Sequence, residues 1–411
     1  MKYFIFLLLL LNLFACSKKE RSKTESHSEV SFLKNKSFFE NSNKAFAYIS
    51  DSQYADDLEF CVDAISEKDA CTPKRLPLIG QKVSQITPRD ILTRTVVSHE
   101  FLGDAFKDVL EKLPSEILQM FGAVNGVVIS DLINPSFYRN ETGVIYLSGR
   151  YFWRNQKEKR IVSIAQDDRE GNSSALPFEI MSTYIRNRHT LNYSENPQIQ
   201  TTEEMTFRLA RLFIHELTHA NDFFPKSFYT SQEFDINSTY FKISNERYDG
   251  YKLISDQMPS YPRSSALQNL AKFYNNRKYE QSSLEQLTAD IVAEEFSKDV
   301  VNDDYNYLNS LEDAAMLMEE LLMSHLFNLE RLWTITKLPH AHYEWKEKEE
   351  LPIFWGKKNI IQFPSVKKRA LYVVESVFDK KFKQEIEVKS ESIKPVTYKE
   401  GTTWEELIRG H

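Results

Sequence analysis

The amino-acid sequence predicts an α+β fold that is rich in helix. Glycine and proline are scarce, with 11 and 14 among 411 residues, and residues 263–338 contain neither. Because these two residues interrupt helices most often, long stretches without them favour helix. Two short apolar runs, Gly126–Ile129 and Gly143–Leu147, are instead typical of buried strands and indicate a small sheet. Apolar residues make up 41% of the chain, which is enough for a hydrophobic core.

The first fifteen residues are typical of an export signal. A positive start is followed by Tyr3–Phe14, which is apolar except for Asn12. This run is too short to cross a hydrocarbon layer of roughly 30 Å as a helix, but it suits the apolar part of a signal peptide. The segment Leu13–Cys16 resembles the lipobox of bacterial lipoproteins. The resemblance implies that residues 1–15 are removed and that Cys16 is acylated.

Residues 16–40 are then expected to be the lipidated end and a flexible tether. The stretch Ser17–Glu29 contains no apolar residue, so it cannot bury itself in a core. Each buried CH₂ of an acyl chain contributes roughly 0.8 kcal/mol to membrane binding. The lipoprotein resemblance implies a bacterial cell envelope, and Ser17 is compatible with the outer membrane, facing the periplasm or the surface.

The cysteine content and the net charge limit the possible compartments and partners further. If Cys16 carries lipid, Cys61 and Cys71 remain as an even pair in an exported space, which favours a disulfide over two free thiols. The formal net charge of −7 argues against a nucleic-acid partner. Neither a dinucleotide-binding nor a P-loop glycine motif occurs.

The strongest chemical signal is a His-Glu-x-x-His motif within Phe213–Ala220. On a helix, residues four apart lie on one face, so His215 and His219 can bind one metal ion. Glu216 lies beside them and can take a proton from metal-bound water. Thr201 and Glu204 have the spacing of a capping box, which predicts a helix that begins directly after Thr201.

This motif resembles the active-site helix of zincin metallopeptidases and is similar to the gluzincin type. Asp222 and Pro225 depart from the pattern that metzincins show after the second histidine. The resemblance implies Zn²⁺ held by His215 and His219, with Glu216 as general base. It covers this helix and at most one strand and one later helix.

Gluzincins take a third ligand from a later helix, and the resemblance leaves two alternatives here. The favoured one is Glu285, on a helix that Ser282 would cap. The other is Asp290, with Glu294 as the carboxylate that orients a histidine.

The family also implies a group that stabilises the oxyanion, for which Tyr279 is favoured and His325 is the alternative. The strand Gly143–Leu147 is expected, by analogy, to be the edge strand that binds an extended substrate.

These observations divide the chain into five parts: a signal (1–15), a tether (16–40), a mostly helical region (41–121), a zincin-like catalytic domain (122–338) and a C-terminal region of unknown role (339–411). Within the catalytic domain, leucines at helical spacing predict one helix over Ser310–Trp333. We expect a membrane-anchored zinc metallohydrolase, most simply a peptidase acting on peptides or proteins of the envelope. The alternative is a non-catalytic zincin-like lipoprotein that binds an envelope component or a partner protein.

Overall fold

The computed structural model confirms an α+β fold. The predicted signal, Cys16 and the tether lie outside the residues that it describes. No helix in the described part of the chain has the length and hydropathy of a membrane span. The structure describes residues 45–63, 70–163, 176–186, 189–190, 198–259, 263–275, 277–338 and 352–409.

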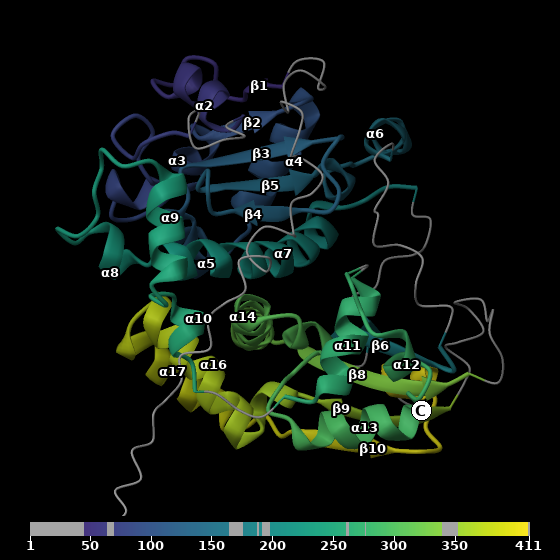
Figure 1. Cartoon of the computed structure of the whole chain (residues 1–411). Helices are drawn as coiled ribbons and strands as arrows, with labels where there is room; N and C mark the ends of the chain where they lie inside the picture. The colour runs from purple at the N-terminus through teal and green to yellow at the C-terminus, as the bar shows by residue number, and fades with distance from the viewer. Residues whose placement is uncertain are drawn as a thin grey trace, which may run out of the picture.

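A five-stranded sheet forms the first half of the molecule, in the order β1-β2-β3-β5-β4 (Figure 1). Strands β2, β3 and β5 are parallel, whereas β1 and β4 run antiparallel at the two edges. The strands are β1 (Phe46–Ala47), β2 (Thr95–Val97), β3 (Gly126–Ser130), β4 (Phe137–Arg139) and β5 (Val144–Ser148). The helices that accompany them are α2 (Ala55–Cys61), α3 (Pro88–Leu92), α4 (Glu100–Leu110), α5 (Ser115–Met120) and α6 (Gln156–Val162).

The two predicted strands are present as β3 and β5, whose residues are all buried. However, β5 lies between β3 and β4, so the prediction that it forms the edge of the sheet is wrong. The edge strand is β4, which has only three half-buried residues. Such a short, partly polar strand has too little apolar pattern to be recognised in the sequence. The Cys61–Cys71 disulfide is confirmed, with the two Cα atoms 5.3 Å apart.

The motif helix is α7 (Thr202–Phe223), and it begins where the capping box predicted. The Thr201 side chain accepts a hydrogen bond from the Glu204 amide, and the Glu204 carboxylate accepts one from the Thr201 amide. Leu209, Phe213 and Leu217 are fully buried along one side of the helix. Helix α7 contacts α4, α5 and the edge strand β4, and it lies below β4 in Figure 1.

A second, antiparallel sheet forms the other half, in the order β10-β9-β8-β6-β7. Helix α14 packs against α7 between the two halves (Figure 1). The strands are β6 (Phe178–Arg186), β7 (His189–Thr190), β8 (Glu330–Lys337), β9 (Ile353–Lys358) and β10 (Val396–Lys399). The remaining helices are α8 (Lys226–Tyr229), α9 (Tyr240–Asp249), α10 (Ile254–Gln257), α11 (Ser265–Tyr274), α12 (Gln281–Leu284), α13 (Ala289–Lys298), α14 (Ser310–Phe327), α16 (Pro364–Val377), α17 (Lys380–Ser390) and α18 (Trp404–Arg409).

The single helix expected over Ser310–Trp333 is two elements. Helix α14 ends at Phe327 because Asn328 adopts a left-handed conformation (φ 56°), which asparagine tolerates and which terminates a helix. Strand β8 begins two residues later, and its central residues are fully buried. The run of apolar and β-branched residues therefore continues past the end of the helix, but its second part forms a buried strand.

The expected domain boundaries do not separate folding units. Residues 121 and 122 lie between β2 and β3, which pair in parallel in one sheet. Residues 338 and 339 lie between β8 and β9, which pair in the other sheet. One contiguous cluster of buried apolar side chains, which includes residues of α4, α7, α14 and α16, joins the two halves.

Candidate metal centre

The two histidines of the motif lie side by side on α7. The ring centroids of His215 and His219 are 5.0 Å apart, and the rings are nearly perpendicular. Both side chains are 13% exposed, so they line the contact between α7 and α14 rather than open solvent. This arrangement follows from the spacing of four residues, which places both side chains one turn apart on the same face.

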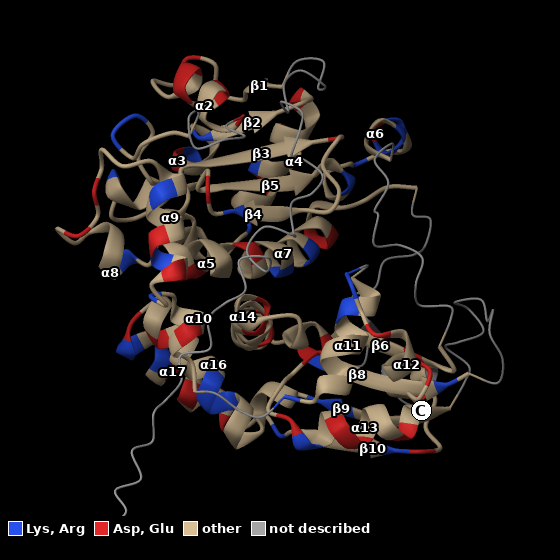
Figure 2. Ribbon diagram, in the orientation of Figure 1, with Lys and Arg blue, Asp and Glu red and all other residues tan. Residues whose placement is uncertain are grey.

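A carboxylate from α14 completes the group. Glu312 Oε2 lies 3.1 Å from His215 Nε2 and 3.4 Å from His219 Nε2. Glu312 is in the first turn of α14, and its amide donates to the side chain of the capping residue Asn309. Ligand atoms of the three side chains all lie within 4.8 Å of one another, so they could hold one metal ion. Figure 2 marks acidic residues in red on α14, next to α7.

The electrostatics of this triad fit a cation. Burial raises the pKa of Glu312, but the two histidines outweigh it and hold that pKa below its usual range. Burial lowers the pKa of His215, but hydrogen bonds with Glu312 and Glu319 raise it to about 10. Without a metal ion, the triad therefore keeps a proton on His215 at neutral pH, at the place where a metal ion would supply the positive charge.

A second carboxylate of α14 lies near the other ring nitrogen of His215. Glu319 Oε2 lies 3.6 Å from His215 Nδ1. Its other oxygen accepts hydrogen bonds from the Tyr184 hydroxyl and from Arg211 Nε, each at 2.9 Å. Arg331 Nη1 lies 3.6 Å from the same oxygen. Carboxylates in this position fix the orientation of a metal-binding imidazole and increase its basicity.

Glu216 is buried beside the triad but held by a different element. Its Oε2 accepts a hydrogen bond of 2.8 Å from the backbone amide of Tyr138, which is in the edge strand β4. Burial is the main cause that raises the pKa of Glu216, and the two histidines oppose it. The metal-ligand group contains His215, His219 and Glu312 without Glu216. The Glu216 carboxylate can therefore exchange protons instead of binding the ion.

A tyrosine lies next to the triad, on a segment that precedes α14. The ring centroid of Tyr305, in the 3₁₀ helix η5 (Asp304–Tyr307), is 5.9 Å from that of His215. Its side chain is half-buried. A phenolic hydroxyl at such a place can donate a hydrogen bond to an oxyanion that forms near the metal.

The structure places the predicted third ligand, Glu285, away from the triad, for a physical reason. Leu284 and Leu287 are buried in the core, so Glu285 between them is exposed, and its carboxylate accepts a hydrogen bond from Gln281. The alternatives Asp290 and Glu294 are on the outer face of α13, at 62% and 67% side-chain exposure, paired with Lys337 and Lys298.

The residues expected to stabilise the oxyanion are also elsewhere. Tyr279 is 36% exposed and packs edge-on against Phe273. His325 follows Glu312 by thirteen residues on α14, or about 20 Å along the helix axis. It packs against Phe382 of α17.

A signal for Glu312 does exist in the sequence. Asn309 precedes it by three residues, which marks a helix start, and Glu319 follows it by seven, on the same face two turns later. Asp313 and Glu320 stand beside them, and four acids on a helix whose other residues are mostly apolar indicate buried carboxylates that need partners. No protein-family model, curated protein or solved structure matches the chain. Function must therefore be inferred from the site.

Proposed function

We propose that this protein is a zinc-dependent metallohydrolase that cleaves peptide bonds. The observation that carries the proposal is the meeting of Glu312 with the His-Glu-x-x-His helix, while Glu216 of that helix stays outside the ligand group. Two imidazoles and one carboxylate are a donor set of catalytic zinc sites, and three protein ligands leave a position for water or substrate. A structural site would more simply use four protein ligands.

Zn²⁺ bound by His215, His219 and Glu312 would lower the pKa of a coordinated water toward 7 and polarise the substrate carbonyl. Glu216 takes a proton from the attacking water and passes it to the leaving amine. Burial favours its protonated form, so the proton can be held between the two transfers. Tyr305 donates its hydroxyl to the developing oxyanion.

The edge strand β4 supplies a place for an extended substrate. The Tyr138 amide points toward Glu216 and therefore away from the neighbouring strand β5. In an antiparallel pair, the carbonyl of the same residue points the same way. Among the described residues, no strand pairs with this side of β4. The Tyr138 amide already donates to Glu216, so a peptide lying along β4 would donate to the Tyr138 carbonyl and place its own carbonyl beside Glu216 and the metal ligands.

We test this function with Glu216→Gln. The variant should bind zinc at the stoichiometry of the wild type but lose about 10²–10⁴-fold in hydrolysis of a quenched-fluorescent peptide mixture, because it loses the general base. Glu285→Gln is the matched control, since Glu285 is exposed and makes no contact with the triad. Full activity of Glu216→Gln would contradict the mechanism. Zinc binding without any turnover by the wild type would instead favour the non-catalytic alternative.

The same proposal places the enzyme on a membrane. Acylation at Cys16 would anchor it in the bacterial cell envelope, with peptides or proteins of that compartment as substrates. Cys16→Ser should abolish incorporation of a clickable palmitate analogue and release the protein from the membrane fraction. Unchanged labelling would contradict the assignment of Cys16.

A further inference from the structure

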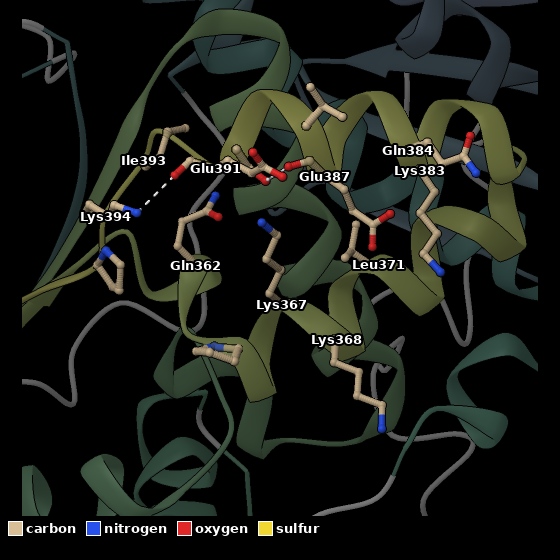
Figure 3. Close-up of a pocket in the computed structure, with 14 residues that line it drawn as sticks. Gln362, Lys367, Lys368, Leu371, Lys383, Gln384, Glu387, Glu391, Ile393 and Lys394 are labelled. Carbon is tan, nitrogen blue, oxygen red and sulfur yellow. Dashed lines mark hydrogen bonds between the residues drawn. The ribbon is translucent and has the colours of Figure 1, made fainter.

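A groove separate from the metal centre lies between α16 and α17. It has a volume of about 770 Å³ and opens to solvent (Figure 3). That volume is within the range of sites for small organic molecules, which is about 300–1,000 Å³. Its lining combines charged side chains of both signs with apolar ones such as Leu371 and Ile393.

A buried donor without a partner lines this groove. Gln362, which precedes α16, is 8% exposed, and its amide nitrogen has no hydrogen-bond partner among the residues that the structure describes. Buried polar groups are nearly always paired, by protein, water or ligand. The orphaned amide therefore indicates that an acceptor from outside the chain completes the site.

A partly buried cation lies beside it. Figure 3 shows the Lys367 side chain rising from α16 toward Glu391, which directly follows α17, with Glu387 of α17 and Gln362 nearby. Burial lowers the pKa of Lys367, while Glu387 and Glu391 raise it. Among the ion pairs of the described residues, none involves Lys367. The Lys367 ammonium is thus poised to pair with an anion.

We propose that this groove binds a small zwitterion. The Gln362 amide and the Lys367 ammonium hold its anionic oxygen group, while Glu387 and Glu391 hold its ammonium. The other lysines of the lining are engaged elsewhere: Lys383 pairs with Glu375, Lys394 donates to the Glu391 carbonyl, and Figure 3 shows Lys368 pointing away. The carboxylates of Glu387 and Glu391 would then repel a bare anion and Lys367 would repel a bare cation, so a ligand with both charges suits the lining. The chemistry is shared by an amino acid or short peptide and by a phosphoethanolamine headgroup.

The test is isothermal titration of the purified protein with glycylglycine and with O-phosphoethanolamine. Inorganic phosphate and ethanolamine carry the separate charges and serve as ligand controls. At least one zwitterion should bind with a Kd below about 10 mM, and both controls should bind at least about tenfold more weakly. Which zwitterion binds identifies the source of the ligand.

Variants assign the binding to the groove. Lys367→Met and Gln362→Met should each weaken zwitterion binding at least about tenfold, or 1.4 kcal/mol. Lys381→Met is the matched control, because Lys381 is on α17 but 85% exposed and outside the groove. Unchanged far-ultraviolet circular dichroism verifies the fold of each variant. Failure of both zwitterions to bind, equally tight binding of phosphate, or unchanged binding by Lys367→Met would overturn the proposal.

Discussion

Substitution of Glu319 tests whether metal binding by the triad depends on the carboxylate that α14 places beside His215. Replacement by Gln keeps the shape of the buried side chain and removes its charge beside His215, whose Nδ1 is 3.6 Å from Glu319 Oε2. Groups that orient a metal-binding histidine contribute about 10–100-fold to metal affinity. We therefore expect Glu319→Gln to raise the zinc Kd by about 10–100-fold, or roughly 1.4–2.7 kcal/mol. Tyr184→Phe should cost less than about tenfold, because Arg211 still holds the carboxylate.

Competition with a fluorescent zinc chelator at fixed pH measures these affinities. Glu320→Gln is the matched control, since Glu320 is the next residue and equally buried. Its oxygens accept from Asn302 Nδ2 and the Ile361 amide, away from His215. Zinc binding by Glu319→Gln that equals the wild type, or an equal loss in Glu320→Gln, would refute the claim that Glu319 acts through His215.

Three further outcomes are expected. Glu312→Gln should fail to retain stoichiometric zinc during dialysis at neutral pH, whereas Glu285→Gln should retain it; the reverse result would restore the sequence-based ligand. Because the partners of His215 raise its pKa to about 10, zinc binding at pH 7.5 should release about one proton from His215, against about 0.1 from a histidine of ordinary pKa. A coordinated water of pKa near 7 would add about 0.8 in either case, so the expected totals are about 1.8 and about 0.9. The pairing of protonated His215 with Glu312 and Glu319 stabilises the zinc-free fold fully below pH 6.5. This stabilisation is lost as the pH rises through 10, and zinc affinity increases over the same range. Titration calorimetry in buffers of different ionisation enthalpy gives the proton count, and a total of about 0.9 or less would show that His215 is neutral. Finally, Cys61→Ser/Cys71→Ser should lower the free energy of unfolding by about 2–3 kcal/mol in urea titrations, and equal stability would show that the bridge is unimportant.

Features that depend on neighbouring residues could be predicted from the sequence. The capping box at Thr201 and Glu204 places the start of α7 correctly. The motif spacing places His215 and His219 together. In each case the signal and its consequence lie within a few turns of chain, so no knowledge of tertiary packing is needed.

The third member of the candidate triad could not be predicted in this way, because it depends on which helix packs against α7. Glu285 has the family-like position, but the buried neighbours Leu284 and Leu287 turn it outward. Glu312 comes 97 residues after His215 and reaches it only through the packing of α14 on α7. Local spacing indicates that a carboxylate is on a helix, but not which element that helix faces.

The burial of charge on α14 identifies the ligand once the packing is known. Four carboxylates of this helix are buried, which is costly unless each is paired. Asp313 pairs with Arg263 and Arg369, Glu319 with Arg211, and Glu320 accepts from Asn302.

Glu312 is different, because its carboxylate has only His215 and His219 as partners among the described side chains. A metal ion requires both imidazoles to be neutral, which would leave Glu312 as a buried negative charge with no counter-charge. Either a proton stays on a histidine or a cation sits between the three side chains. One proton balances Glu312 alone, whereas a divalent ion would also balance the Glu216 carboxylate that is buried beside the same histidines, so this group of two imidazoles and two carboxylates favours a metal site over a buried ion pair.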